Sequence, residues 1–197
     1  MPCRCVFCNI AATYPPAPFH EPPSHAADAD SNSGAPTQPT AHMILSTKHV
    51  MAFLDIMPLT AGHVLVAPRL HYEKLGDMEV KVGKEMGVWL PIISRVVTKT
   101  IFGEDPDRHW NVVQNNGARA AQVVPHVHFH IIPRPSTDGV HKPGFAMFGR
   151  GQRSELDDDE GEELARAMRA ELAREIERIH REEGVDLSTD HIKRGKL

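Results

Sequence analysis

Runs of apolar and β-branched residues predict five short strands in the middle of the chain. Each run is only a few residues long and is bounded by proline, glycine or polar turn residues, which is typical of strands. The first two runs flank a short polar turn and predict a hairpin. The predicted strands cover residues 43–45, 50–55, 63–67, 109–114 and 123–133.

Two longer segments have helical periodicity. Between residues 75 and 100 the apolar side chains recur every three or four positions, which places them on one face of a helix. Residues 157–183 show the same spacing, with acidic residues crowding the start and Gly184 following the end. We therefore expect an α+β fold, with an antiparallel sheet of about five strands, one main helix across it and a C-terminal helix.

Length and composition place the chain among globular proteins of one domain. The 197 residues are 41% hydrophobic and carry a formal net charge of −4, which gives no sign of a nucleic-acid surface. We find no apolar run of membrane-spanning length and no signal peptide, so we expect a cytoplasmic protein without a membrane partner. We assign residues 1–150 to the main domain, 151–184 to the C-terminal amphipathic helix and 185–197 to a tail.

Residues 15–42 differ from the rest of the main domain. This segment is rich in proline, serine and aspartate and has few large apolar groups. Such a composition does not offset the entropy of ordering the chain. We predict a disordered insertion.

Three cysteines within the first eight residues suggest a metal site. Cys5 and Cys8 have the spacing with which two thiolates bind one zinc ion, although redox pairs share this spacing. The chain has no second cysteine pair, so two histidines would have to complete a tetrahedral site.

The predicted strand 123–133 carries the densest candidate chemistry. Because side chains alternate along a strand, His126, His128 and His130 share one face. The outer two would lie roughly 13 Å apart, which is too far for one metal ion to bind all three. At least one imidazole must have another role, and a neutral imidazole held in one tautomer is a good nucleophile near pH 7.

These residues resemble the signature of the histidine triad family of nucleotide hydrolases and transferases. The His-Val-His-Phe-His-Ile-Ile sequence of residues 126–132, the Gln-Asn-Asn-Gly of residues 114–117 and the Ala-Gln of residues 121–122 are similar to its Hint branch. The resemblance covers roughly residues 3–14 and 43–135. It implies an HIT-like fold that forms a dimer, and one structural zinc ion per chain bound by Cys5, Cys8, His71 and His126.

The same resemblance implies roles for the remaining site residues. His128 would be the nucleophile, assisted by His130 and His63. Asp55 would bind the ribose, although an aspartate at a strand end often only caps a turn. The residues implied at the phosphate are Asn115, Gln122 and Val123, the last standing where many Hint proteins have a serine.

The implied function is hydrolysis of a purine nucleotide, most simply an adenosine 5′-phosphoramidate, with release of AMP. Within the family, a dinucleoside polyphosphate hydrolase and a nucleotidyl transferase stay open. From another class, the chain could be a zinc-stabilised nucleotide-binding or scaffold module. We see no paired-carboxylate magnesium motif.

Overall fold

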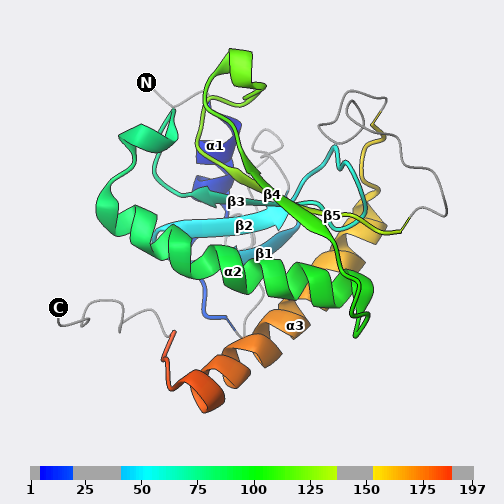
Figure 1. The fold of residues 1–197 in the computed structure, drawn as a ribbon. Helices are drawn as coiled ribbons and strands as arrows, with labels where there is room; N and C mark the ends of the chain where they lie inside the picture. The colour runs from blue at the N-terminus through cyan, green and yellow to red at the C-terminus, as the bar shows by residue number, and fades with distance from the viewer. Residues whose placement is uncertain (1–4, 20–40, 137–152, 188–197) are drawn as a thin grey trace, which may run out of the picture.

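A computed structural model describes residues 5–19, 41–136 and 153–187. Within them the chain forms an antiparallel sheet and three α-helices, which confirms the predicted α+β fold (Figure 1). The greater part of the predicted insertion and the boundary at residue 150 lie outside the described residues. The strands are β1 (Met43–Ser46), β2 (Val50–Leu54), β3 (Val64–Pro68), β4 (Trp110–Gln114) and β5 (Phe129–Pro133). The helices are α1 (Val6–Thr13), α2 (Val80–Phe102) and α3 (Asp158–Glu183), with short 3₁₀ turns η2 (Leu75–Asp77) and η3 (Ala118–Ala120).

The strand order places β5 inside the sheet. The order is β1-β2-β3-β5-β4, so β5 pairs with β3 on one side and with β4 on the other. Both pairings are antiparallel, and each extends no further toward the N-terminus of β5 than Phe129. The histidine-bearing segment thus leads into a strand that is paired on both sides.

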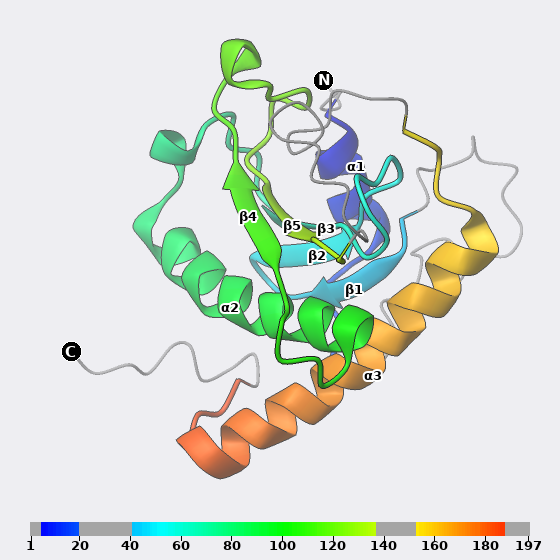
Figure 2. The ribbon, with the colours of Figure 1, turned by 45° about the vertical axis from the view of Figure 1, so that its right-hand side comes forward.

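The two faces of the sheet are covered by different helices. The larger core lies on the face covered by α2 and α3, where Trp89, Met86 and Leu172 are almost fully buried. Helix α1 lies on the other face (Figure 2). Its Phe7 and Ile10 belong to a buried cluster with residues of β2 and β3. The short helix α1 therefore covers the face on which the histidines lie.

The C-terminal helix packs against its own chain. Its apolar stripe, including Met168 and Leu172, belongs to the same buried cluster as residues of α2. Asp157 caps the helix by accepting hydrogen bonds from Asp159 and Glu160, and Gly184 ends it with a φ of 67°. None of the described helices combines the length and the apolar character needed to span a bilayer.

The structure corrects two predicted boundaries. The strand predicted over residues 123–133 begins only at Phe129, because neither β3 nor β4 offers a paired residue before it. Upstream, the His126 N–H donates to Val124 O and the Val127 N–H to Tyr72 O, which is not a strand ladder. The helix predicted from residue 75 begins at Val80, after the turn η2.

Candidate functional site

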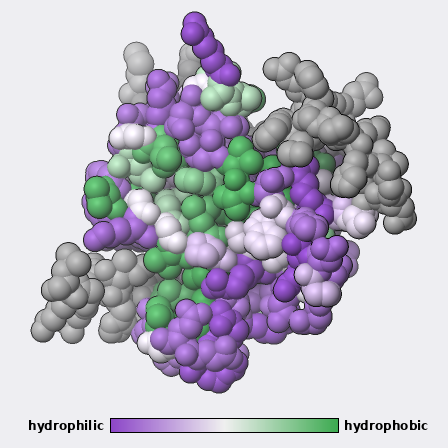
Figure 3. All heavy atoms as spheres, viewed as in Figure 1, coloured by the Kyte–Doolittle hydropathy of each residue, from purple (hydrophilic) through white to green (hydrophobic). Residues whose placement is uncertain are grey.

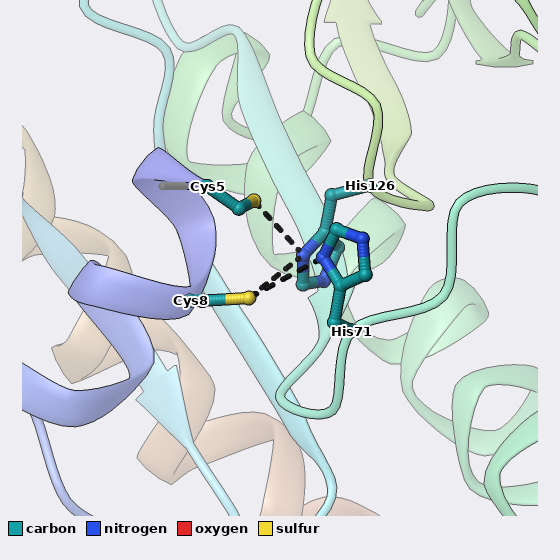
Figure 4. Close-up of side chains that lie close together, drawn as sticks. All are labelled: Cys5, Cys8, His71 and His126. Atoms are coloured by element: carbon teal, nitrogen blue, oxygen red, sulfur yellow. Dashed lines mark hydrogen bonds between the residues drawn. The ribbon is translucent and has the colours of Figure 1, made fainter. Parts of the chain in front are cut away.

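Two thiols and two imidazoles meet between α1 and the histidine segment. The Cys5 Sγ lies 3.4 Å from His126 Nδ1, and the Cys8 Sγ lies 3.4 Å from His71 Nδ1 and 3.7 Å from His126 Nδ1 (Figure 4). One ligand atom from each residue falls within 4.8 Å of all the others. Sulfur and nitrogen ligands on a tetrahedral zinc ion lie about 3.6 Å apart, given bond lengths of about 2.3 and 2.1 Å. The four side chains therefore have the composition and spacing of a zinc site.

The ring of His126 is oriented for metal binding. Its Nε2–H donates to the Pro68 carbonyl at 2.8 Å, which leaves Nδ1 unprotonated and facing the two sulfurs. Burial lowers the pKa of His126 to about 4, so the ring is neutral near pH 7. A neutral imidazole with its second nitrogen fixed by a carbonyl is the usual form of a histidine ligand.

Helix α1 explains why the cysteines converge. Cys5 is the N-cap and Cys8 lies one turn later, so both face the same side of the helix. Phe7 anchors this turn by edge-to-face contacts with the rings of His126 and His128, with centroids 5.7 and 5.2 Å apart. An eight-residue helix is too short to be recognised from periodicity, so the sequence pattern predicts neither this helix nor the contacts of Phe7.

The His128 ring is held by its own backbone. Its Nδ1–H donates to the His126 carbonyl at 2.6 Å, which leaves Nε2 unprotonated when the ring is neutral. Burial lowers the pKa of His128, while the same hydrogen bond and the charge of Asp55 raise it. The ring is thus suited to nucleophilic attack, and burial rather than a charged neighbour is the main reason that it stays neutral.

His63 and His130 form a second, continuous hydrogen-bonded chain. The Leu59 N–H can only donate, so His63 Nδ1 is the acceptor at 3.2 Å and the ring proton lies on Nε2. His63 Nε2 then donates to His130 Nδ1 at 3.0 Å, which places the proton of His130 on its Nε2. Burial lowers the pKa of His63 to about 3 and that of His130 to about 4.

Asp55 lies beside this chain. Its Oδ1 accepts the Met57 N–H at 2.9 Å, and its Oδ2 is 3.4 Å from His63 Nδ1. Burial raises the pKa of Asp55, while the Met57 N–H and the positive charge of Arg153 lower it. The turn-capping contact considered from the sequence is therefore present, and it uses one of the two carboxylate oxygens. Asp55, His63 and His130 are close enough to suggest a second metal group, but both nitrogens of His63 are already hydrogen-bonded.

The loop before the triad is held by Gln122. Its side chain accepts the Gly117 N–H at 2.5 Å and donates to Glu73 O at 2.7 Å, and its own N–H donates to Gly117 O. Gly117 has a φ of 86°, as expected for this Asn-Gly turn. The Val123 side chain next to it is 90% exposed. Asn115 follows β4 directly, and its carbonyl accepts the Gln114 side-chain amide at 2.9 Å.

Arg153 also lies at this site, although no pattern in the sequence indicates it. Arg153 precedes α3 and donates from Nη1 to the Met57 carbonyl at 3.2 Å. Its positive charge contributes to lowering the pKa of Asp55, His63 and His130. Because Arg153 lies 96 residues beyond Met57 in the sequence, only the fold reveals their proximity.

Residues 37–137, half of the chain, match the HIT domain family. The chain belongs to the HIT family. An uncharacterised HIT-like protein of Methanocaldococcus jannaschii is 38% identical over 119 residues, which are 60% of this chain and 84% of that protein. The adenosine 5′-monophosphoramidase of Schizosaccharomyces pombe is 42% identical over 100 residues, which are 49% of this chain and 69% of that enzyme.

The solved structures of HIT proteins share the fold. A zinc-bound histidine triad protein of Mycobacterium smegmatis superposes with a TM-score of 0.56 at 29% identity, covering 87% of this chain and 94% of that protein. The match extends beyond the HIT domain of residues 37–137 and so takes in segments on either side of it. The fold and the family predicted from the sequence are both confirmed.

Proposed function

We propose that this HIT protein is a hydrolase that releases a nucleoside monophosphate, AMP in the simplest case, from nucleotides with a phosphoramidate or phosphoric anhydride bond. The observation that carries the proposal is the His128 ring, whose Nδ1–H is fixed on the His126 carbonyl while Nε2 keeps its lone pair. The phosphoramidase of S. pombe, with 42% identity, supports this class of substrate.

The reaction would proceed in two displacements at the α-phosphorus. His128 Nε2 attacks, a phosphorus–nitrogen bond to the enzyme forms, and the bond to the leaving group breaks. His130 Nε2–H donates a hydrogen bond to the leaving group, which takes its proton from water. Water then attacks the nucleotidyl-histidine, which releases AMP and restores His128.

The same geometry supports an assignment of the groups that would bind the nucleotide. Asp55 would accept hydrogen bonds from the ribose hydroxyls, because a carboxylate that accepts the Met57 N–H keeps further lone pairs. Asn115 and the main-chain N–H of Val123 would position the phosphate. Since the Gln122 amide and side chain are bonded within the protein, we expect its part to be the shaping of the loop.

We further propose that Cys5, Cys8, His71 and His126 hold one structural zinc ion. Their spacing and the orientation of His126 fit this ion, and the zinc-bound relative of M. smegmatis supports the choice. A bound zinc ion would cross-link the start of α1 to the segment before β5. It would take no part in the reaction at phosphorus.

A homodimer is part of the proposal. Strand β4 lies at an edge of the sheet and exposes Trp110 and Val112 to 42% and 48%, and Val88 of α2 is also exposed. Figure 3 shows hydrophobic side chains gathered over the face on which α2 and β4 lie. An edge strand with exposed apolar residues is a natural place for a second copy to pair.

A single assay tests the proposed activity. Purified protein is supplied with a fluorogenic adenosine 5′-phosphoramidate, and diadenosine polyphosphates are run beside it. We expect phosphoramidate turnover with release of AMP, and His128→Ala as the control should abolish it. Preference for the polyphosphates would assign the chain to the other hydrolase branch. AMP binding without turnover of either substrate would leave a nucleotide-binding module and refute the enzyme.

A further inference from the structure

The segment before α3 is fastened to the loop that carries Asp55. The Leu156 N–H donates to the Ile56 carbonyl at 2.9 Å, and Arg153 Nη1 donates to the Met57 carbonyl at 3.2 Å. Ile56 and Met57 directly follow Asp55, whose carboxylate is bonded to the Met57 N–H. Two contacts therefore hold Arg153 at the residues next to the proposed ribose carboxylate.

Arg153 brings a positive charge to side chains of the site that carry none at neutral pH. His63 and His130 are neutral near pH 7, with pKa values lowered by burial to about 3 and about 4, and Asp55 is the acid beside them. These groups offer no positive charge to an anionic nucleotide. The positive charge of Arg153 contributes to lowering the pKa of all three groups, whereas that of Arg134 contributes to lowering the pKa of His63. A guanidinium stays charged when it donates to a main-chain carbonyl.

We propose that Arg153 is a specificity-determining residue, whose fixed positive charge binds the phosphate of the nucleotide held by Asp55 and the histidines. The inference rests on the proposed function and adds a residue outside the triad and outside the HIT match at residues 37–137. Arginine suits this task, since its planar fork of N–H donors matches phosphate oxygens. The site then discriminates a nucleotide from its uncharged nucleoside by charge.

A different role would have a different signature. If Arg153 acted only on Asp55, by keeping the carboxylate ionised or by fixing its loop, its loss would weaken ribose binding. AMP and adenosine share that ribose, so both ligands would lose affinity equally. A phosphate contact affects AMP alone. The ratio of the two affinities therefore separates the two roles.

The experiment measures dissociation constants of AMP and adenosine by calorimetry, at low and at moderate salt, for four full-length proteins. These are the unmodified chain, Arg153→Gln, Arg153→Lys and, as a control that removes the same charge elsewhere, Arg166→Gln on the exposed side of α3. For Arg153→Gln we expect AMP binding to weaken about tenfold or more, as for loss of a charge-assisted hydrogen bond, with adenosine binding unchanged. Arg153→Lys should keep most of the preference for AMP, and Arg166→Gln all of it.

The outcomes are distinguishable. Equal losses for AMP and adenosine, or no loss for either, would overturn the role of Arg153 while the proposed function stands. If the unmodified chain binds AMP no better than adenosine and turns over no phosphoramidate, the proposed function itself fails. A weaker salt dependence of AMP binding in Arg153→Gln than in the unmodified chain would support the proposal independently.

Discussion

At the scale of single residues, the three histidines of the triad have different partners. His126 faces two thiols, His128 is bonded to a main-chain carbonyl, and His130 belongs to a hydrogen-bonded chain. The spacing of His126, His128 and His130 already shows that one metal ion cannot bind all three. What spacing could not show is the partner of each ring nitrogen. His126 provides both a ring for the proposed metal and the carbonyl that orients His128. Those partners depend on main-chain atoms whose positions the sequence pattern does not define.

The pH dependence of the proposed reaction follows from the environment of His128. Because burial lowers its pKa below the ordinary value of 6.5, the ring is neutral at pH 7. Activity should therefore fall only as pH drops through this lowered pKa. We expect kcat/KM for an adenosine phosphoramidate to show an acid limb with its midpoint below 6.5.

The variant Asp55→Asn provides a control for the acid limb of this pH profile. The negative charge of Asp55 raises the pKa of His128, so Asp55→Asn should move the midpoint to still lower pH, whatever it does to the maximum rate. A limb centred at or above 6.5 in the unmodified protein would contradict this view of His128.

At the scale of elements, long periodic segments could be predicted and short ones could not. The two long helices and all five strands were found from their patterns, because an apolar face repeats several times along each. Helix α1 has only eight residues, and the start of β5 is determined by where β3 and β4 offer partners. Those limits are set by contacts between distant parts of the chain, which no local pattern contains.

The proposed metal site predicts the effect of removing the Cys5 thiol at the start of α1. Protein purified without chelators should contain one zinc ion per chain, and Cys5→Ser should lower both the zinc content and the melting temperature while some activity remains. Cys3→Ser, which removes a neighbouring cysteine that no proposed role uses, is the matched control. Metal analysis that finds no zinc in the unmodified protein would rule out the site.

The docking of α3 gives a second prediction at this scale. A Cβ on Gly161 would come within 2.4 Å of His42 Nε2, so the first turn of α3 could not pack as it does. Gly161→Ala should destabilise the fold by about 1–3 kcal/mol through this overpacking. In α2, a Cβ on Gly87 meets nothing within 4 Å, so Gly87→Ala should be neutral or stabilising. Equal stabilities of the two variants in chemical denaturation would show that α3 adjusts freely.

At the scale of the whole molecule, the sheet has two covered faces and, at β4, an edge with exposed apolar residues. The sheet buries one face under α2 and α3 and the other under α1, while β4 leaves Trp110 and Val112 exposed. The sequence pattern predicts the apolar stripe of α3 but does not define the surface against which this stripe packs. The stripe packs within the chain because Met168 and Leu172 reach the core shared with α2.

The exposed edge predicts the oligomeric state. If β4 and α2 form the homodimer contact, replacing Trp110 and Val112 by charged residues should produce monomers in light scattering after size exclusion. A suitable control is Val185→Lys, because Val185 is also exposed, to 44%, but lies after α3. An unmodified protein that is already monomeric at micromolar concentration would exclude this contact.

The central claim is that His128 forms a covalent bond to the nucleotide. Rapid quenching of the protein with a labelled adenosine phosphoramidate, followed by peptide mapping, tests it most directly. We expect an acid-labile and base-stable nucleotidyl adduct on His128. His128→Ala should lose the adduct and about 10⁴-fold or more in kcat, yet still bind AMP through Asp55 and main-chain donors. An adduct on His63 or His126, or near-normal turnover by His128→Ala, would contradict the mechanism.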